Sequence, residues 1–401
     1  MLFSQLGWWL INGVLGVAAS IVLVICLHFL IECSAALLPF SGKNYQGRWQ
    51  DTQVAVLVPA HNEELVIADT LAHIIPQLKS QDRVVVIADN CSDATAEIAR
   101  GTGAVVIERH DRTHQGKGYA LDYGLDFLAV EPPDIVVFID ADCIVQGGAI
   151  AMLSEWAIAS NRPIQGNYFM AKPQSNPSAK DFISQFSIII KNIVRSQGLT
   201  NLGQSSLLLG TGMAFPWQVI RSVNMASGHL VEDMKLGLDL TIAGYPTIFC
   251  PEAQVTANLP SQQQAAKSQR TRWVHGHLQA IRTYVPRLIT EAITQKRFDL
   301  LVCLLDLCIP PLSLLTVIWL MVMLITLLFA VWGMGWTAVA IATIAGCCFL
   351  TAVIIAWAKF ARQELPLSRL LAIPGYLLWK IPIYLKFVIK PQSKWVRTDR
   401  N

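Results

Sequence analysis

Long apolar runs at both ends of the chain limit its fold more than any other feature of the sequence. Residues 8–39 are almost wholly apolar, and residues 1–42 contain no Lys or Arg. A run of this length can cross a bilayer as a helix. Because it lacks the basic start and small-residue cleavage site of a signal peptide, we expect residues 1–42 to hold a retained N-terminal transmembrane helix. Glu32 lies near one end of the run, where the membrane interface could solvate it.

Two further apolar runs lie closer to the C-terminus. Residues 300–331 are interrupted by Asp306 and by the pair Pro310–Pro311, and residues 336–358 carry no charge. We expect residues 300–358 to form two transmembrane helices. Asp306 marks either a lipid or glycan path or the packed end of a helix, and we favour the packed end.

Basic residues beside these runs predict their orientation. Lys43 and Arg48 follow the first run, and Lys359 and Arg362 follow the third. Lys and Arg are enriched in cytoplasmic loops. Three crossings that begin outside satisfy this rule at every step, which predicts a multi-pass protein of the cell membrane with residues 43–276 in the cytoplasm.

Two apolar segments that carry charges are expected to lie along the membrane surface. Residues 277–299 contain several basic side chains, which predicts an interfacial helix. Residues 359–401 contain an apolar stretch broken by Lys380 and Pro382, followed by a basic tail. Because a fourth crossing would place that tail outside, we expect interfacial or re-entrant helices there.

Residues 43–276 have the pattern of an α/β domain. Apolar runs of strand length alternate with helical patterns, which indicates a largely parallel sheet that becomes mixed in the second half. The expected strands cover 54–58, 84–88, 104–107 and 135–139, and the expected helices cover 63–78, 93–100 and 116–128.

The composition excludes several classes of partner. The chain is 53% hydrophobic and 15% charged, and a soluble domain usually has about a quarter of its residues charged. The net charge of only +3 gives no electrostatic footprint for nucleic acid. The nine Cys residues are scattered without a repeated C-x-x-C pair, so we expect reduced thiols and no zinc site.

The strongest local chemical signal is the D-x-D segment that contains Asp140 and Asp142. It follows a predicted strand, and ligands of open α/β sheets bind at the carboxyl ends of strands. Two carboxylates one residue apart can hold a hard divalent cation, which binds diphosphate oxygens and stabilises a leaving nucleotide. A turn with two solvated Asp residues is the alternative.

Polar groups also follow the first two predicted strands. In the segment 58–64, Pro59 is expected to end the strand and the polar residues to open a helix, which suits a nucleotide. Asp89 can accept hydrogen bonds from a base or a ribose, and helix capping is the alternative at both places. Lys117 lies between two glycines and could meet a phosphate, although the Walker spacing is absent.

Two later segments can serve an acceptor. Of the adjacent acids Glu232 and Asp233, one can act as the general base for a hydroxyl, and the alternative is an exposed acidic helix start. Gln269, Arg272 and Trp273 share one helix face by their spacing. That face offers hydrogen bonds, a phosphate clamp and a flat surface for a sugar, or else a basic helix at the membrane edge.

Taken in this order, the segments resemble the family 2 glycosyltransferases of the cellulose, chitin and hyaluronan synthase type, over roughly residues 50–275 and the flanking helices. The resemblance implies a GT-A fold, which is a Rossmann-like α/β domain with a mixed sheet, here flanked by transmembrane helices. It also implies an inverting, single-displacement transfer from a UDP-sugar, with Mg²⁺ or Mn²⁺ as the cofactor.

The resemblance further implies roles for individual residues. The nucleotide sugar would contact Pro59, Ala60, His61, Glu63, Asp89, Lys117, Asp140 and Asp142, and the last two would hold the metal. Asp233 would be the general base. The diphosphate and the acceptor would contact Gly210, Thr211, Gly212, Glu232, Gln269, Arg272 and Trp273. The chain departs from the family pattern at His61, where Tyr is commoner, and at Val231, where Thr often precedes the Glu-Asp pair.

The sequence predicts an enzyme and leaves two activities open. The first is the extension of a β-linked glycan, which the Q-x-x-R-W pattern accompanies in the family. The second is a single transfer to a lipid or lipid-linked acceptor, which the small membrane region favours. The expected partners are a UDP-sugar donor, a glycan or lipid acceptor, membrane lipids, and an export partner or a second copy of the chain. A catalytically inactive scaffold is disfavoured because every expected acidic residue is present.

Overall fold

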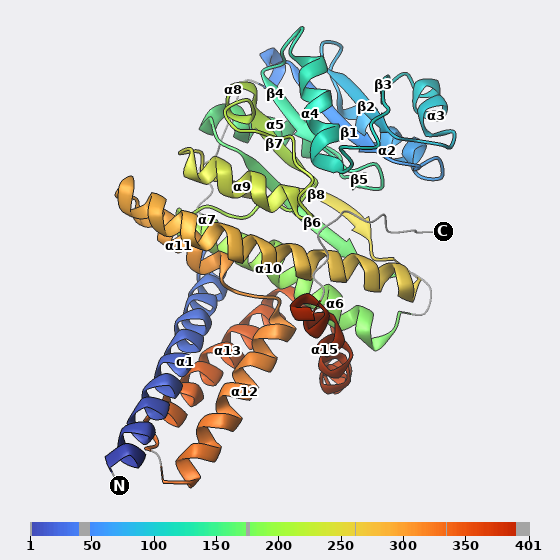
Figure 1. Ribbon diagram of the computed structural model, residues 1–401. Helices are drawn as coiled ribbons and strands as arrows, with labels where there is room; N and C mark the ends of the chain where they lie inside the picture. The colour runs from blue at the N-terminus through green and yellow to red at the C-terminus, as the bar shows by residue number, and fades with distance from the viewer. Residues whose placement is uncertain (1, 40–48, 174–176, 261, 334, 390–401) are drawn as a thin grey trace.

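The apolar runs between residues 54 and 258 form one mixed β-sheet in the computed structural model (Figure 1), which describes residues 2–39, 49–173, 177–260, 262–333 and 335–389. The strand order is β3-β2-β1-β4-β7-β6-β8-β5. β1 to β4 run parallel, and β7 is antiparallel to β4 and β6. The strands are β1 (Val54–Ala60), β2 (Arg83–Asp89), β3 (Val105–Arg109), β4 (Ile135–Phe138), β5 (Ile144–Val145), β6 (Ile164–Ala171), β7 (Met213–Pro216) and β8 (Ile248–Asn258).

Helices cover both faces of the sheet, because successive strand residues point to opposite sides. Val54, Val56 and Val58 of β1 enter one core with α2, α3 and α5, whereas Ala55 and Leu57 enter a second core with α4, α8 and α9. The helices of the domain are α2 (Ile67–Ile74), α3 (Thr95–Gly101), α4 (Lys117–Leu128), α5 (Ala149–Ser160), α6 (Ala179–Ile189), α7 (Ser196–Asn201), α8 (Trp217–Ile220) and α9 (Glu232–Ile242), with short segments η1 (Trp49–Asp51), η2 (Ile75–Gln77) and the π-helical η3 (Ile190–Arg195). The predicted α/β architecture with a sheet that becomes mixed is confirmed.

Three long apolar helices flank the domain within the part of the chain that the structure describes. α1 (Leu2–Ala35), α12 (Leu312–Val331) and α13 (Thr337–Ala356, continued by η4, Trp357–Ala361) are each long and apolar enough to cross a membrane. They form a bundle below the domain (Figure 1). Trp319 packs its indole directly against Gly346, where an added Cβ would lie 2.4 Å from the ring, so only glycine fits at this contact.

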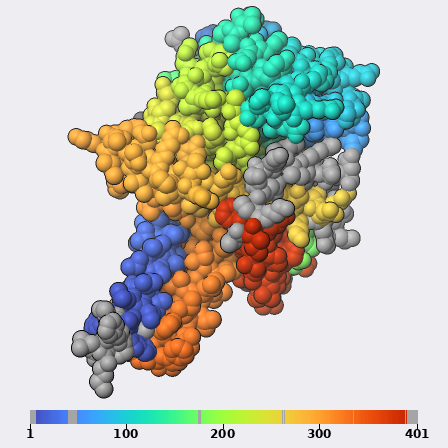
Figure 2. Space-filling view, in the orientation of Figure 1, coloured from blue at the N-terminus to red at the C-terminus, as the bar shows by residue number. Residues whose placement is uncertain are grey.

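A layer of helices separates the sheet from the bundle (Figure 1). α10 (Gln263–Thr294) crosses the molecule and packs on α9 and α11 (Phe298–Leu307). α14 (Leu367–Leu370) and α15 (Ile373–Ile389) close the other side, where α15 contacts α6, α10 and α12. In Figure 2 the red α15 lies beside the orange helices of the bundle.

The structure corrects several expected boundaries. The chain breaks at Pro310–Pro311, so the apolar run from residue 300 becomes the short α11 followed by a spanning helix that begins only at Leu312. α10 runs without interruption through residue 277, so the predicted interfacial segment and the Q-x-x-R-W motif belong to one helix. Pro59 lies inside β1, which continues to Ala60 because β1 pairs with the parallel β2 through both residues. The predicted basic tail lies outside the described residues.

Glu32 is buried and not placed where the interface solvates it. Its carboxylate pairs with the Arg195 guanidinium at 2.8 Å, and the same guanidinium pairs with Asp306 at 2.5 Å. His28 lies 2.9 Å from the second Glu32 oxygen. Glu32 on α1 and Asp306 on α11 are therefore joined through η3, which agrees with the preferred interpretation of Asp306 as a packed helix end.

Candidate active site

The loops that follow β1 and β2 form one wall of a cavity. Asn62 turns the chain after β1 with a left-handed φ of 55°. The Nδ1 atom of the His61 ring lies 2.6 Å from the carbonyl oxygen of Asp89. The backbone amide of Glu63 donates to the Thr95 hydroxyl oxygen at 2.7 Å. These hydrogen bonds fix the two strand ends to each other.

Asp89 is held by an arginine that the sequence analysis did not single out. The Arg109 guanidinium lies 2.7 Å from the Asp89 carboxylate, and both side chains are buried. Burial raises the pKa of Asp89, and the hydrogen bond and charge of Arg109 oppose that rise. The two residues are register partners on β2 and β3, so their contact follows from strand pairing and not from sequence proximity.

Lys117 joins the D-x-D loop to the loop that contains Gly210. Its ammonium group makes an ion pair with Asp140 and donates to the Gly210 carbonyl oxygen at 2.7 Å. Burial by itself would lower the pKa of Lys117, but the carboxylates of Asp140, Glu232 and Asp233 raise it above its usual value. Lys117 is therefore a fixed cation among the acids of the site.

Buried polar groups shape the Gly210–Gly212 loop. The Gln165 side-chain amide donates to the Thr211 carbonyl oxygen at 2.9 Å. The Thr211 hydroxyl accepts from the backbone amide of Asp140 at 3.0 Å. Thr211 and Gly212 are buried behind the cavity wall, so Gly210 alone of the predicted trio lines the cavity.

The acidic pair begins α9, as expected. Gly210 has a φ of 98°, and a Cβ added there would lie 3.2 Å from an Asp233 carboxylate oxygen, so the site needs glycine at this position. Burial, followed by the charge of Asp233, raises the pKa of Glu232 to about 7. Glu232 therefore changes its charge close to neutral pH.

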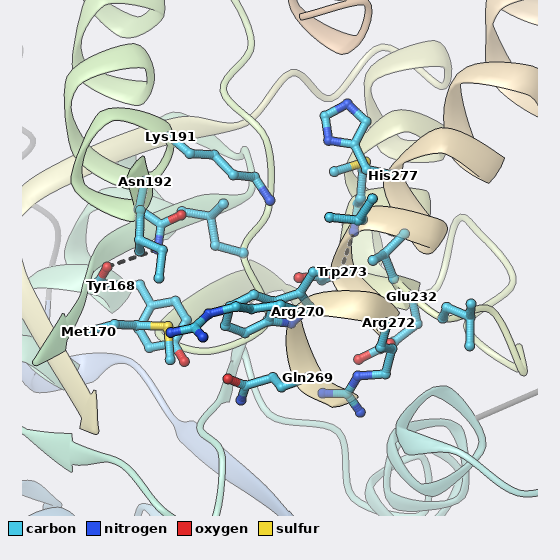
Figure 3. Close-up of a pocket in the computed structure, with 18 of the residues that line it drawn as sticks. Tyr168, Met170, Lys191, Asn192, Glu232, Gln269, Arg270, Arg272, Trp273 and His277 are labelled. Atoms are coloured by element: carbon cyan, nitrogen blue, oxygen red, sulfur yellow. Dashed lines mark hydrogen bonds between the residues drawn. The ribbon is translucent and has the colours of Figure 1, made fainter. Parts of the chain in front are cut away.

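The Q-x-x-R-W face of α10 forms another wall of the cavity. Gln269, Arg272 and Trp273 all line it, as their helical spacing predicts (Figure 3). Gln269 is 4% exposed, yet its carbonyl oxygen has no hydrogen-bond partner among the described residues, and neither has the Arg272 Nε atom. Buried polar atoms are normally paired, so these two are free for a ligand.

One cavity of about 440 Å³ collects the predicted residues. It is lined by Pro59, Ala60, His61, Glu63, Asp89, Lys117, Asp140, Asp142, Gly210, Glu232, Asp233, Gln269, Arg272 and Trp273. The same cavity continues past them to groups that the sequence analysis did not assign to the site, namely Tyr168, Lys191, Arg270, His277, Tyr376 and Lys380. The two halves of the predicted site, which lie far apart in sequence, thus line one cavity.

Asp140 and Asp142 suit a divalent metal that a ligand helps to hold. Both carboxylates face the cavity, and the described residues contain no cluster of three or more His, Cys, Asp or Glu that could hold a metal by themselves. Mg²⁺ and similar ions are usually bound by one or two carboxylates together with substrate phosphates. The donor set fits such an ion, and Asp140 is also paired with Lys117.

The comparisons with known proteins agree with this geometry. The family model described as "Glycosyltransferase like family 2" matches residues 52–276, more than half of the chain. The chain is 26% identical over 261 residues to the probable glycosyltransferase YdaM of Bacillus subtilis (strain 168), covering 62% of this chain and 60% of that relative. It is 23% identical over 288 residues to a poly-beta-1,6-N-acetyl-D-glucosamine synthase of Staphylococcus aureus (strain COL), covering 68% of this chain and 64% of that relative. The matched part is therefore less than two thirds of either relative.

A solved structure supports the fold. The mannosyltransferase PcManGT from Pyrobaculum calidifontis, in complex with GDP-Man and Mn²⁺, superposes with a TM-score of 0.56 and 16% identity over 95% of this chain and 100% of that chain. At this identity the likeness concerns the fold, and it confirms the predicted GT-A-type domain. With more than half of the chain matched by the family model, this protein belongs to glycosyltransferase family 2, and the prediction of an enzyme is confirmed.

Proposed function

We propose that the chain transfers a sugar from a UDP-sugar to a hydroxyl group of a growing β-glycan, with inversion at the anomeric carbon. The observation that carries this proposal is the single cavity that is lined by Asp89, Asp140 and Asp142 together with Asp233 and Trp273. Its volume of about 440 Å³ falls within the range of ligand pockets, about 300–1,000 Å³. The synthase from Staphylococcus aureus, a β-glycan-forming relative by its name, supports the choice of acceptor.

Each residue has a defined part in this transfer. Asp233 accepts the proton of the acceptor hydroxyl while its oxygen attacks the anomeric carbon. The bond from that carbon to the diphosphate breaks, and the electron pair leaves with the nucleotide. Lys117 and Arg272 face the developing negative charge of the diphosphate, and Gln269 has a free carbonyl oxygen for a sugar hydroxyl.

A divalent ion at Asp140 and Asp142 would supply charge neutralisation to the leaving diphosphate when bound. The Mn²⁺ in PcManGT supports an ion of this kind without separating Mn²⁺ from Mg²⁺. Residues of this chain position the loop that would hold the ion. Lys117 holds the Asp140 side chain in place, and the Thr211 hydroxyl fixes the backbone of the same loop.

We further propose that the catalytic domain lies on the cytoplasmic side of the cell membrane, with three crossings. The three apolar helices and the basic residues that follow the first and third of them support this orientation. UDP-sugars are charged, so a cytoplasmic site meets its donor without transport. An export partner or a second copy of the chain would complete a secretion path that three helices do not enclose by themselves.

Product sizing tests the proposal. Membranes that contain the full chain are incubated with radiolabelled UDP-sugars and GDP-mannose, with Mn²⁺ or Mg²⁺, and the products are separated by size and by solvent extraction. A ladder or polymer from one UDP-sugar is the expected result, and an Asp233→Asn variant should give none. Incorporation from GDP-mannose alone would refute the assignment of a UDP-sugar as the donor. Equal incorporation by the Asp233→Asn variant would refute the assignment of Asp233 as the general base.

A second candidate is a single transfer to a lipid or lipid-linked acceptor. It is favoured by the continuation of the cavity from Trp273 to Pro310, Pro311 and Leu312, where the spanning helix α12 begins. In the same experiment this reaction would give one labelled product that is soluble in organic solvent.

A further inference from the structure

α10 carries a glycine in line with the Q-x-x-R-W residues. Gln269, Arg272, Trp273 and Gly276 stand at positions i, i+3, i+4 and i+7, a spacing that places them on one face of the helix. A glycine inside a helix destabilises it by about 0.5–1 kcal/mol relative to alanine. Gly276 has no positive φ, so its backbone conformation would accept alanine. A close contact is the remaining reason for a glycine at this position.

Val231 occupies the space that a side chain at position 276 would need. A Cβ atom added to Gly276 would lie 2.6 Å from Cγ1 and 3.1 Å from Cγ2 of Val231, whereas carbon atoms in contact normally lie about 3.5–4.0 Å apart. Val231 has little freedom to turn away, because its side chain is β-branched and only 7% exposed. It belongs to a buried cluster with Met234 and Leu238 of α9. A methyl group at position 276 would therefore have to separate α10 from Val231 by about 1 Å.

Val231 directly precedes the acidic pair and is the N-cap residue of α9. Its carbonyl oxygen accepts a hydrogen bond of the first helical turn, from the Lys235 backbone amide at 3.1 Å. A displacement of Val231 is therefore transmitted to Glu232 and Asp233, which line the same cavity. Burial raises the pKa of Glu232, and the charge of Arg272 on α10, which lies near it in Figure 3, is one of those that oppose the rise. The start of α9 thus faces the Q-x-x-R-W residues.

Two more glycines contact the chain around the start of α9. A Cβ atom added to Gly118 of α4 would lie 2.5 Å from the Ser227 carbonyl oxygen, and one added to Gly210 would lie 3.2 Å from an Asp233 carboxylate oxygen. Lys117, the cation beside the D-x-D loop, precedes Gly118 in the same helix. The chain that leads into α9 is therefore packed directly on the backbone of α4, of the Gly210 loop and of α10.

We propose that Val231 and Gly276 are positioning residues of the transfer reaction, because their contact sets the distance between the Asp233 carboxylate and the Q-x-x-R-W face of α10. The inference rests on the proposed function for the role of Asp233 as the general base. A base acts only within hydrogen-bond reach of the hydroxyl that it deprotonates. A misplacement of about 1 Å can lower a rate about 100-fold, so one methyl group at position 276 should be sufficient to impair the chemical step.

Paired substitutions in the full-length protein in membranes test the inference. Gly276→Ala should lower kcat for sugar transfer about 100-fold while UDP with Mn²⁺ still binds. Val231→Ala removes both Cγ atoms that the added methyl group would meet. The double variant should therefore transfer sugar at least about tenfold faster than Gly276→Ala alone, because substitutions of contacting residues are not additive. Each kcat is expressed per UDP-binding site, so partial unfolding of a variant does not mask the comparison.

Gly101→Ala is the matched control. Gly101 is the last residue of α3, and it also has no positive φ. Outside its own helix, no atom of the described residues lies within 4 Å of the position that an added Cβ would take. This variant should transfer sugar and bind UDP as the unmodified protein does.

Each other outcome overturns the inference. A normal kcat in Gly276→Ala would mean that the contact does not position the base. Loss of UDP binding together with transfer would mean a structural role only. A double variant that is no faster than Gly276→Ala would mean that Val231 is not the residue that the methyl group displaces.

The same assay separates this inference from the proposed function. It uses whichever nucleotide sugar the unmodified protein accepts, so a wrong donor assignment leaves the comparison intact. Asp233→Asn is measured beside the other variants. Full transfer by Asp233→Asn would refute the proposed base, whereas its loss of transfer together with normal transfer by Gly276→Ala would refute the positioning role alone.

Discussion

Replacement of Arg195 by Met tests whether one buried guanidinium holds α1 and α11 to the α/β domain. Arg195 lies on η3 and is 5% exposed. It contacts Glu32 of α1 at 2.8 Å and both the carboxylate and the backbone carbonyl of Asp306 on α11. Met keeps most of the volume of the side chain and removes its charge and all of its donors.

The loss of folding stability should be large because one guanidinium, that of Arg195, pairs with two carboxylates. Breaking a buried ion pair by removing one partner costs about 3–5 kcal/mol, and we expect the upper part of that range, about 4–5 kcal/mol. Burial raises the pKa of Asp306 to about 6 even with Arg195 present, and without Arg195 it should rise further. A protein loses stability with rising pH when folding raises the pKa of one of its acids. The free energy of unfolding of the variant should therefore be lower at pH 8 than at pH 5.

The assay is equilibrium unfolding by denaturant of the full chain in detergent at both pH values. Arg287→Met is the control, because Arg287 pairs with Asp239 at 2.6 Å but has a side chain that is 47% exposed, and such pairs contribute about 0–1 kcal/mol. An Arg195→Met variant that differs from this control by less than 1 kcal/mol would refute the reasoning, and so would a greater loss at pH 5 than at pH 8.

Three further predictions concern the reaction centre. Asp233→Asn should lower sugar transfer about 10²–10⁴-fold in a radiolabel assay while UDP binding with Mn²⁺ is retained, and loss of both would mean a misfolded site. Glu232→Gln should remove the fall in thermal stability between about pH 4.5 and pH 7 that its raised pKa gives the unmodified protein, so parallel curves would contradict that pKa. Gly210→Ala should abolish transfer by displacing Asp233. Gly103→Ala, with a similar φ of 88° and open space around it, should cost only backbone strain of about 1–2 kcal/mol and leave transfer intact.

The donor half of the site could be predicted because its residues follow strands that the sequence marks clearly. The apolar runs before Asp89 and Asp140 identify β2 and β4, and parallel strands bring their carboxyl ends to one edge. The face of α10 was predictable for a similar reason, because Gln269, Arg272 and Trp273 follow helical spacing. Local periodicity was sufficient in both cases.

Groups that depend on contacts between distant segments were not predictable. The Arg109–Asp89 pair requires the register of β2 and β3, and Gln165 reaches Thr211 only across the junction of β6 and β7. Glu32 was expected at the membrane interface, because its actual partner, Arg195, lies 163 residues away in the sequence and no nearby residue indicates it. A charge within an apolar run signals a partner, but it does not identify that partner.

The same distinction explains the two ends of the cavity. The donor end is built from strand ends and the loops that follow them, where Asp89, Asp140 and Asp142 lie. The other end is built where α15 packs on α6 and on α12, so its lining residues come together only once those helices have packed. Lys380 was visible in the sequence as a cation within an apolar stretch, and packing converts it into a buried cation that lines the cavity. The donor end of the cavity therefore follows from local motifs, whereas its other end depends on how α15 packs on α6 and α12.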